Sequence, residues 1–189
     1  MGNADPWTHT MRRLLSLGLC LFALALPADR GHAQIQSFDL AAMLARTDHV
    51  VAGEIVEHEV LSFPDPSGEG VNWFTRLTID GRSLIDGREL SVDVHFLGGM
   101  TESGEGVWNS EAPLAEDVEQ GGRVVAFYKW LDDMGGGVPG NFLYAMHGGL
   151  FRTVSGPQGP VVLGRGQGYA VRENLLLDDL DEAVRTLSR

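Results

Sequence analysis

A series of short β-like runs, interrupted by glycines, most limits what this chain can fold into. Residues 71–80 and 90–96 alternate apolar and polar side chains, a pattern typical of strands with one buried face. Residues 123–131 are apolar on both faces, which predicts a central strand. Residues 49–63 contain Gly53 within strand-like sequence, as the curved strands of small barrels do, and residues 142–154 predict another strand, broken at Gly148 and Gly149. We therefore expect a mainly β fold, a small antiparallel barrel of five to six strands, with a β-sandwich as the alternative.

Two helices are expected at the ends of the folded domain. Apolar residues at helical spacing predict a short helix within residues 40–47, with Ser37 or Asp39 as its cap. Residues 178–187 predict a C-terminal helix, with Asp178 as its cap and further acids in the first turn. No repeat, low-complexity tract or linker lies between them, so we expect a single domain.

Residues 1–33 are expected to be a signal peptide, followed by the domain at residues 34–189. A pair of arginines precedes an apolar run at residues 14–26, and small residues lead to a cleavage site after Ala33. Met11 is an alternative start, because the residues before it are polar. The apolar run is shorter than the roughly 20 residues that cross a bilayer, so no membrane insertion is expected after cleavage. These features predict an exported protein of the bacterial type, either periplasmic or secreted.

The cysteine content and the charge limit how the domain is held together and what it binds. Cys20 is the only cysteine and lies in the apolar run, so the exported domain depends on its core without disulfides. The chain has a net charge of −12, and three basic and two acidic residues precede the cleavage site, which leaves −13. A surface this acidic repels phosphate backbones and anionic membranes, so nucleic acid is not an expected partner.

Five segments occur in an order that resembles a known family: "VVAGEIV", "LIDG", "VDVHFLGG", "GGRVVAFYKWL" and "YAMHGGLFRTV". The chain resembles the small OB-like β-barrel domain of exported bacterial proteins, some of which sit near matrixin-type metallopeptidases. The resemblance extends to about Val154, and its motif positions are Gly53, Gly87, Gly98, Gly99, Gly122, Phe127 and Phe151. It departs from the family pattern where Leu97 replaces a proline and Arg123 replaces an acid. The resemblance implies an OB-like barrel and an exported location, and it brings no catalytic site.

The expected binding surface is a face of the barrel or its loops, around residues 100–112 and 132–141. Gly98 and Gly99 end a predicted strand and are expected to let the backbone turn sharply. Residues 100–112 follow, and long loops on small barrels commonly carry the binding surface. Trp108 on this loop can stack on a sugar or a peptide, or it can cover the end of the core. The candidate residues for binding a protein partner or an extracellular ligand are Trp108, Asn109, Trp73 and His95.

The alternative function is that of an enzyme or a metal-binding protein. Asp93 and His95 lie two residues apart on a predicted strand and share a face, and His147 can join them as a third ligand. A zinc-peptidase motif is missing, because Ser62 stands where a second histidine must follow His58. The sequence contains no G-x-S-x-G motif, and the exported domain contains no cysteine nucleophile. We therefore expect a non-catalytic protein without a cofactor.

Overall fold

The computed structural model describes residues 39–68 and 70–188. The predicted signal peptide, its cleavage site, Cys20 and the candidate cap Ser37 lie outside the described residues. No helix within the described ranges combines the length and the apolar character that crossing a membrane requires.

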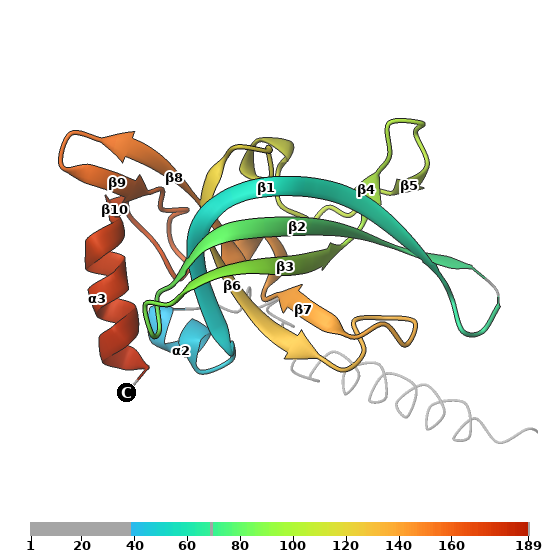
Figure 1. Ribbon diagram of the computed structural model, residues 1–189, viewed down its shortest axis with the longest axis horizontal. Helices are drawn as coiled ribbons and strands as arrows, with labels where there is room; N and C mark the ends of the chain where they lie inside the picture. The colour runs from blue at the N-terminus through green and yellow to red at the C-terminus, as the bar shows by residue number, and fades with distance from the viewer. Residues whose placement is uncertain (1–38, 69, 189) are drawn as a thin grey trace, which may run out of the picture. The chain divides into compact units, whose positions relative to one another are not determined.

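Five strands close into a barrel (Figure 1). Their order around the barrel is β1 (His49–Pro64), β2 (Val71–Ser83), β3 (Glu89–Leu97), β7 (Gly140–Leu143) and β6 (Arg123–Leu131). β6 then pairs with β1, so the sheet returns to its first strand. β3 and β7 run parallel, while the other neighbours run antiparallel. The structure confirms a mainly β fold with an OB-like barrel, not a sandwich, and adds one parallel pair to the predicted antiparallel arrangement.

Three further strands extend the sheet from β6: β8 (Leu150–Gly156), β9 (Gly159–Val162) and β10 (Leu175–Leu176). The two predicted helices are present as α2 (Leu40–Leu44) and α3 (Leu177–Leu187). α3 follows directly on β10 and lies beside the end of this extension (Figure 1).

One predicted helix cap is confirmed and the other is wrong. The Asp39 carboxylate accepts a hydrogen bond of 2.7 Å from the amide of Ala42 and thereby caps α2. At α3 the capping position is held by Leu176, because β10 runs into the helix without an intervening loop. Asp178 lies in the first turn of α3, where a negative charge still opposes the positive end of the helix dipole.

The predicted strand at residues 142–154 is two strands separated by a turn. β7 ends at Leu143, the short 3-10 helix η2 (Met146–Gly149) follows, and β8 begins at Leu150. Ala145 and Met146 have φ angles of 54° and 50°, a conformation that interrupts a strand. The glycines at the end of η2 do not break a single strand but lead the chain into β8.

The barrel closes where β1 meets β2 and β6 together. Gly53 lies opposite Gly81 on β2 and opposite Val124 on β6. A Cβ atom at Gly53 would overlap the carbonyl oxygen of Asp80, so glycine is needed for the strands to approach this closely. The register shift that indicates a bulge follows between Ile55 and Glu57. Gly53 thus allows the close approach of two strands, and the predicted bulge occurs three residues later, at Val56.

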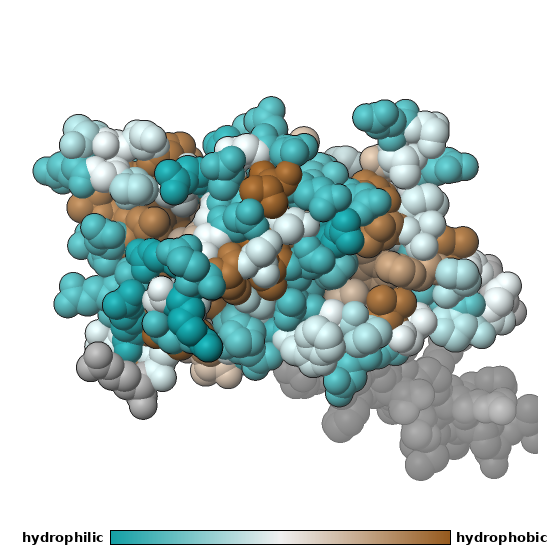
Figure 2. Space-filling view, viewed as in Figure 1, coloured by the Kyte–Doolittle hydropathy of each residue, from teal (hydrophilic) through white to brown (hydrophobic). Residues whose placement is uncertain are grey.

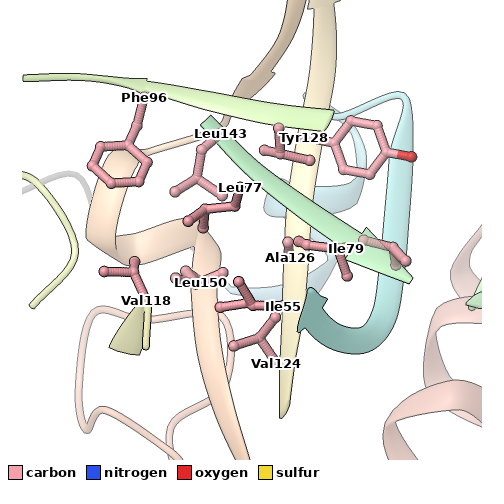
Figure 3. Close-up of a cluster of buried hydrophobic side chains, with 12 residues drawn as sticks. Ile55, Leu77, Ile79, Phe96, Val118, Val124, Ala126, Tyr128, Leu143 and Leu150 are labelled. Carbon is pink, nitrogen blue, oxygen red and sulfur yellow. The ribbon is translucent and has the colours of Figure 1, made fainter. Parts of the chain in front are cut away.

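Two groups of buried apolar side chains form the core. The first fills the barrel, and its side chains converge from all five strands (Figure 3). Its labelled members are Ile55, Leu77, Ile79, Phe96, Val118, Val124, Ala126, Tyr128, Leu143 and Leu150. The second lies between the outer face of the β1, β6, β8 and β9 sheet and the two helices, and includes Phe127, Phe151, Leu180 and Val184. Together they supply the disulfide-free core that the sequence requires.

β2 differs from its predicted alternation at Phe74 and at Trp73. Thr75, Leu77 and Ile79 are buried as expected, but Phe74 on the opposite face is also fully buried. Its ring packs 5.9 Å from the ring of Phe63, and the connector between β6 and β7 passes over it at Gly135. Trp73, predicted to lie inward, is only half-buried.

Candidate functional site

The segment after β3 turns away from the barrel at two glycines, as predicted. Gly98 and Gly99 have φ angles of 92° and 143°, which side chains disfavour. The amide of Gly98 donates to the carbonyl of Trp73 at 2.8 Å, and the Thr75 hydroxyl donates to the carbonyl of Gly98 at 2.8 Å. Thr75 is buried, so this turn is fixed to β2 from the barrel side. The two glycines therefore have a backbone role at the end of a strand.

A small hairpin and an asparagine then shape the predicted binding loop. β4 (Gly99–Met100) pairs with β5 (Gly106–Val107) in a separate two-stranded sheet. The Asn109 side-chain amide donates to the carbonyl of Leu97 at 3.1 Å, and its oxygen accepts from the amide of Glu111 at 3.0 Å. Asn109 thus connects the end of the hairpin to β3, and its side-chain nitrogen and oxygen both bond backbone groups of this segment.

An apolar pocket of about 250 Å³ lies between this loop and the barrel strands. The strands contribute His58 and Val60 from β1, Thr75 from β2 and Phe96 from β3. The opposite wall comes from the loop and from η1 (Ala115–Asp117) and its flanks, with Met100, Val107, Trp108, Leu114 and Val118. Figure 2 shows hydrophobic surface below the β4–β5 hairpin, set among hydrophilic residues.

The loop side of the pocket exposes more apolar surface than the fold itself requires. Trp108 is 82% exposed and Leu114 is 57% exposed, while Met100 and Val107 are about half exposed. Side chains this exposed do not cover the core, which excludes the structural alternative for Trp108. Clustered apolar groups with a polar rim are typical of surfaces that bind a partner.

The surroundings of the pocket are strongly acidic. Residues 100–122 include six acids and no lysine or arginine. Two of these acids form ion pairs. The buried carboxylate of Asp117 lies 2.6 Å from the guanidinium of Arg165 and 3.4 Å from that of Arg152, and the carboxylate of Glu116 lies 3.6 Å from that of Arg152. The remaining four acids of this segment, Glu102, Glu105, Glu111 and Glu119, have no ion pair among the described residues. The pocket is therefore lined mostly by apolar groups, and the segment that forms its loop wall carries an acidic rim, the four acids near lining residues in the sequence that have no ion pair among the described residues.

The two other predicted binding residues lie away from the pocket. Trp73 contributes its carbonyl to the Gly98 turn, and its side chain does not line the pocket. His95 lies on the face of β3 opposite to Phe96, where Nδ1 donates to the carbonyl of Asn141 at 3.2 Å. This contact joins β3 to β7 where the two strands run parallel. Trp108 and Asn109 thus belong to the site, whereas Trp73 and His95 support the barrel.

The three metal-ligand candidates are not brought together. Asp93 accepts a hydrogen bond of 2.7 Å from Thr78, on the outer face of the barrel. His147 is held elsewhere, since Nδ1 donates to the carbonyl of Glu111 at 3.0 Å and Nε2 lies 2.9 Å from the Tyr169 hydroxyl. Across residues 39–68 and 70–188, no three His, Cys, Asp or Glu side chains are placed to hold a metal ion.

Comparison with protein-family models, with curated proteins and with solved structures finds no match for this chain. Any function of this chain must therefore be inferred from the site itself.

Periodicity in the sequence does not reveal the strand side of the pocket or Leu114. His58 stands out only as part of an incomplete zinc-peptidase motif, Val60 lies in a long β-like run, and Leu114 lies in a polar connection. One signal was available, because apolar residues recur at positions 100, 107, 108 and 114 inside a stretch without a basic residue. Such a composition favours an exposed acidic surface with apolar contacts.

Two histidines, His58 on β1 and His95 on β3, predict a pH dependence of stability. Burial lowers the pKa of His58, and burial is also the main cause that lowers the pKa of His95, from the usual 6.5. Protonation therefore favours the unfolded chain, so their contribution is complete above pH 6.5 and is lost as the pH falls toward the lowered pKa values. Urea unfolding at about pH 7.5 and about pH 5 is expected to show lower stability at the acidic pH. The double variant His58→Gln, His95→Gln is expected to lose less stability over this interval, and an unchanged loss would contradict the prediction.

Proposed function

We propose that this chain is an exported, non-catalytic binding module that holds a protein partner through the apolar pocket beside Trp108. The observation that carries the proposal is the group of half-exposed apolar side chains around a pocket on an otherwise acidic surface. Hydrophobic pockets with a rigid aromatic side chain at the rim are where binding energy concentrates in protein interfaces.

Two further features support a binding role over the enzymatic alternative. His95 and His147 each donate a ring N–H to a backbone carbonyl, which gives both imidazoles a structural role. The pocket itself presents mostly apolar groups, and its titratable side chain, His58, has a pKa that burial lowers. A surface of this kind favours recognition of apolar side chains.

Export is part of the proposal and is tested separately. The native protein is expected outside the cytoplasm with Gln34 as its first residue, because small residues precede that position in the order of a cleavage site. Cell fractionation followed by N-terminal sequencing measures this. An intact N-terminus on a cytoplasmic protein would refute it.

Trp108→Ala is expected to weaken partner binding at least about tenfold, because aromatic side chains at pocket rims are frequent hot spots. Its effect on the free energy of unfolding is expected to stay within about 0.5 kcal/mol, because Trp108 is 82% exposed. A photoreactive amino acid at position 108, introduced in the native organism, is expected to give a crosslinked adduct of defined mass.

The matched control for this experiment is position 130. Trp130 is also exposed, at 52%, but it lies on β6 and does not line the pocket. The same photoreactive residue there is expected to give no such adduct. Equal crosslinking at both positions, or none at position 108, would reject the pocket as the binding site.

A further inference from the structure

One edge of β1 borders the pocket, and some of its backbone groups have no hydrogen-bond partner among residues 39–68 and 70–188. β6 pairs with β1 only as far as Glu54. The backbone of Ile55 still bonds Gly122 and Gly121, and the carbonyl of Val56 accepts from the Gln120 side chain at 2.7 Å. From His58 onward β1 is paired on one side by β2, and no strand is paired to its other side within the described residues.

The register identifies which groups face this open edge. The carbonyl of Trp73 accepts a hydrogen bond from the amide of Gly98, on the side of β2 that faces β3. Because backbone groups alternate in direction along a strand, Trp73 and every second residue after it direct their N–H and C=O groups away from β1. His58 and Val60 lie opposite two of these residues, Leu77 and Thr75. Residues opposite each other at such positions both turn their N–H and C=O outward. The backbone groups of His58 and Val60 are therefore available to an added strand.

The same two residues direct their side chains into the pocket. In a strand added antiparallel to this edge, the residues that bond His58 and Val60 place their side chains on the same face. Every second side chain of an added strand would thus enter the pocket between Val60 and the wall formed by Trp108 and Leu114. Backbone pairing and side-chain burial are available to one ligand at once, which is the way strand-addition sites bind peptides.

The charge around the pocket restricts the ligand further. Glu102 and Glu105 are exposed on the β4–β5 hairpin, and Glu111 and Glu119 lie on the connection to β6. These unpaired acids repel an acidic segment and attract lysine or arginine.

Resting on the proposed binding function, we infer that the partner is recognised as an extended peptide segment that adds to the β1 edge at His58–Val60. The segment has apolar side chains at alternate positions, which fill the pocket, and lysine or arginine at its ends, which lie near the acidic rim. The pocket determines which side chains fit, and the strand edge determines their orientation.

The test uses a synthetic peptide of the sequence Lys-Val-Thr-Val-Thr-Val-Lys with a fluorescent label. Binding to the folded protein is measured by fluorescence anisotropy. A twin with glutamate at both ends is expected to bind at least about tenfold more weakly at low salt, and the difference is expected to shrink at about 1 M salt. The double variant Glu102→Gln, Glu105→Gln is expected to reduce the difference, whereas Glu173→Gln, Glu182→Gln, on exposed residues distant from the pocket, leaves it unchanged.

Two N-methylated forms of the peptide test strand addition directly. One is methylated on the valine amides and the other on the threonine amides, and only one of these two sets can face β1. We expect one form to lose binding at least about tenfold and the other to bind as the parent does. Equal binding or equal loss in the two forms would overturn strand addition, as would failure of the parent peptide to bind.

These outcomes are distinguishable from failure of the proposed function. If position 108 crosslinks to a partner but the peptide does not bind, the pocket binds a folded surface and only strand addition is wrong. If position 108 gives no adduct, the proposed function fails with it.

Discussion

Alanine at Gly53 or at Gly81 is expected to lower the free energy of unfolding by at least about 3 kcal/mol, at the upper end of what an added methyl group costs in a packed site. The two glycines face each other across β1 and β2. A Cβ at Gly81 would overlap the carbonyl oxygen of Ala52, and one at Gly53 would overlap that of Asp80. Because these obstacles are backbone atoms, no rotamer change can relieve them. The strands cannot separate either, since β6 holds β1 at Val124 on its other side.

Urea unfolding of the two alanine variants measures this effect, and Gly70→Ala is the matched control. A Cβ at Gly70 meets nothing within 4 Å, and its backbone does not require glycine, so a change within about 0.5 kcal/mol is expected there. Absence of a cooperative transition in the Gly53 or Gly81 variants would be the extreme form of the expected result. Stability equal to that of the control would show that β1 and β2 can move apart at the closure.

Most of the barrel could be predicted because its long strands carry their own periodicity. β2 and β3 alternate in the sequence as they do in the structure, and β6, apolar on both faces, is indeed paired on both sides. The rest depends on contacts between distant segments. Phe74 is an apolar residue on the otherwise polar face of β2. It is buried there because the connector at Gly135, some sixty residues later in the chain, packs against its ring. The four residues of β7 are too few to show a period, so its parallel pairing with β3 could not be read from the sequence.

The candidate site divides in the same way. Trp108 and Asn109 could be predicted from a long loop after paired glycines, which is a local signal. The other wall of the pocket comes from β1, and the inward direction of His58 and Val60 depends on the extra residue at Val56 that shifts the register. A one-residue shift reverses which side chains face inward. His95 was a candidate because it shares a face with Asp93, and its side chain is instead half-buried and bonded to the carbonyl of Asn141 on β7.

The loop wall of the pocket depends on one buried carboxylate. Asp117 is 5% exposed and accepts from Arg165 at 2.6 Å, and Arg152 lies 3.4 Å away. Its carboxylate also accepts from the amide of Leu114 at 3.3 Å, which connects the charge network to the pocket wall. Arg165 in turn donates to the carbonyl of Leu150 at the start of β8. Asp117 therefore fixes η1 and Leu114 against the barrel.

Asp117→Ala is expected to cost about 3 kcal/mol of stability, because it leaves a partly buried guanidinium without its carboxylate. Glu116→Ala is the control: Glu116 is 60% exposed and lies 3.6 Å from Arg152, so a loss of at most about 1 kcal/mol is expected. Urea unfolding of both variants gives the comparison. The double variant Asp117→Ala, Arg165→Met is expected to recover part of the loss, since it removes the unpaired charge together with the acid. Equal losses in the Asp117 and Glu116 variants would mean that solvent reaches Arg165 and that the wall is not held by this ion pair.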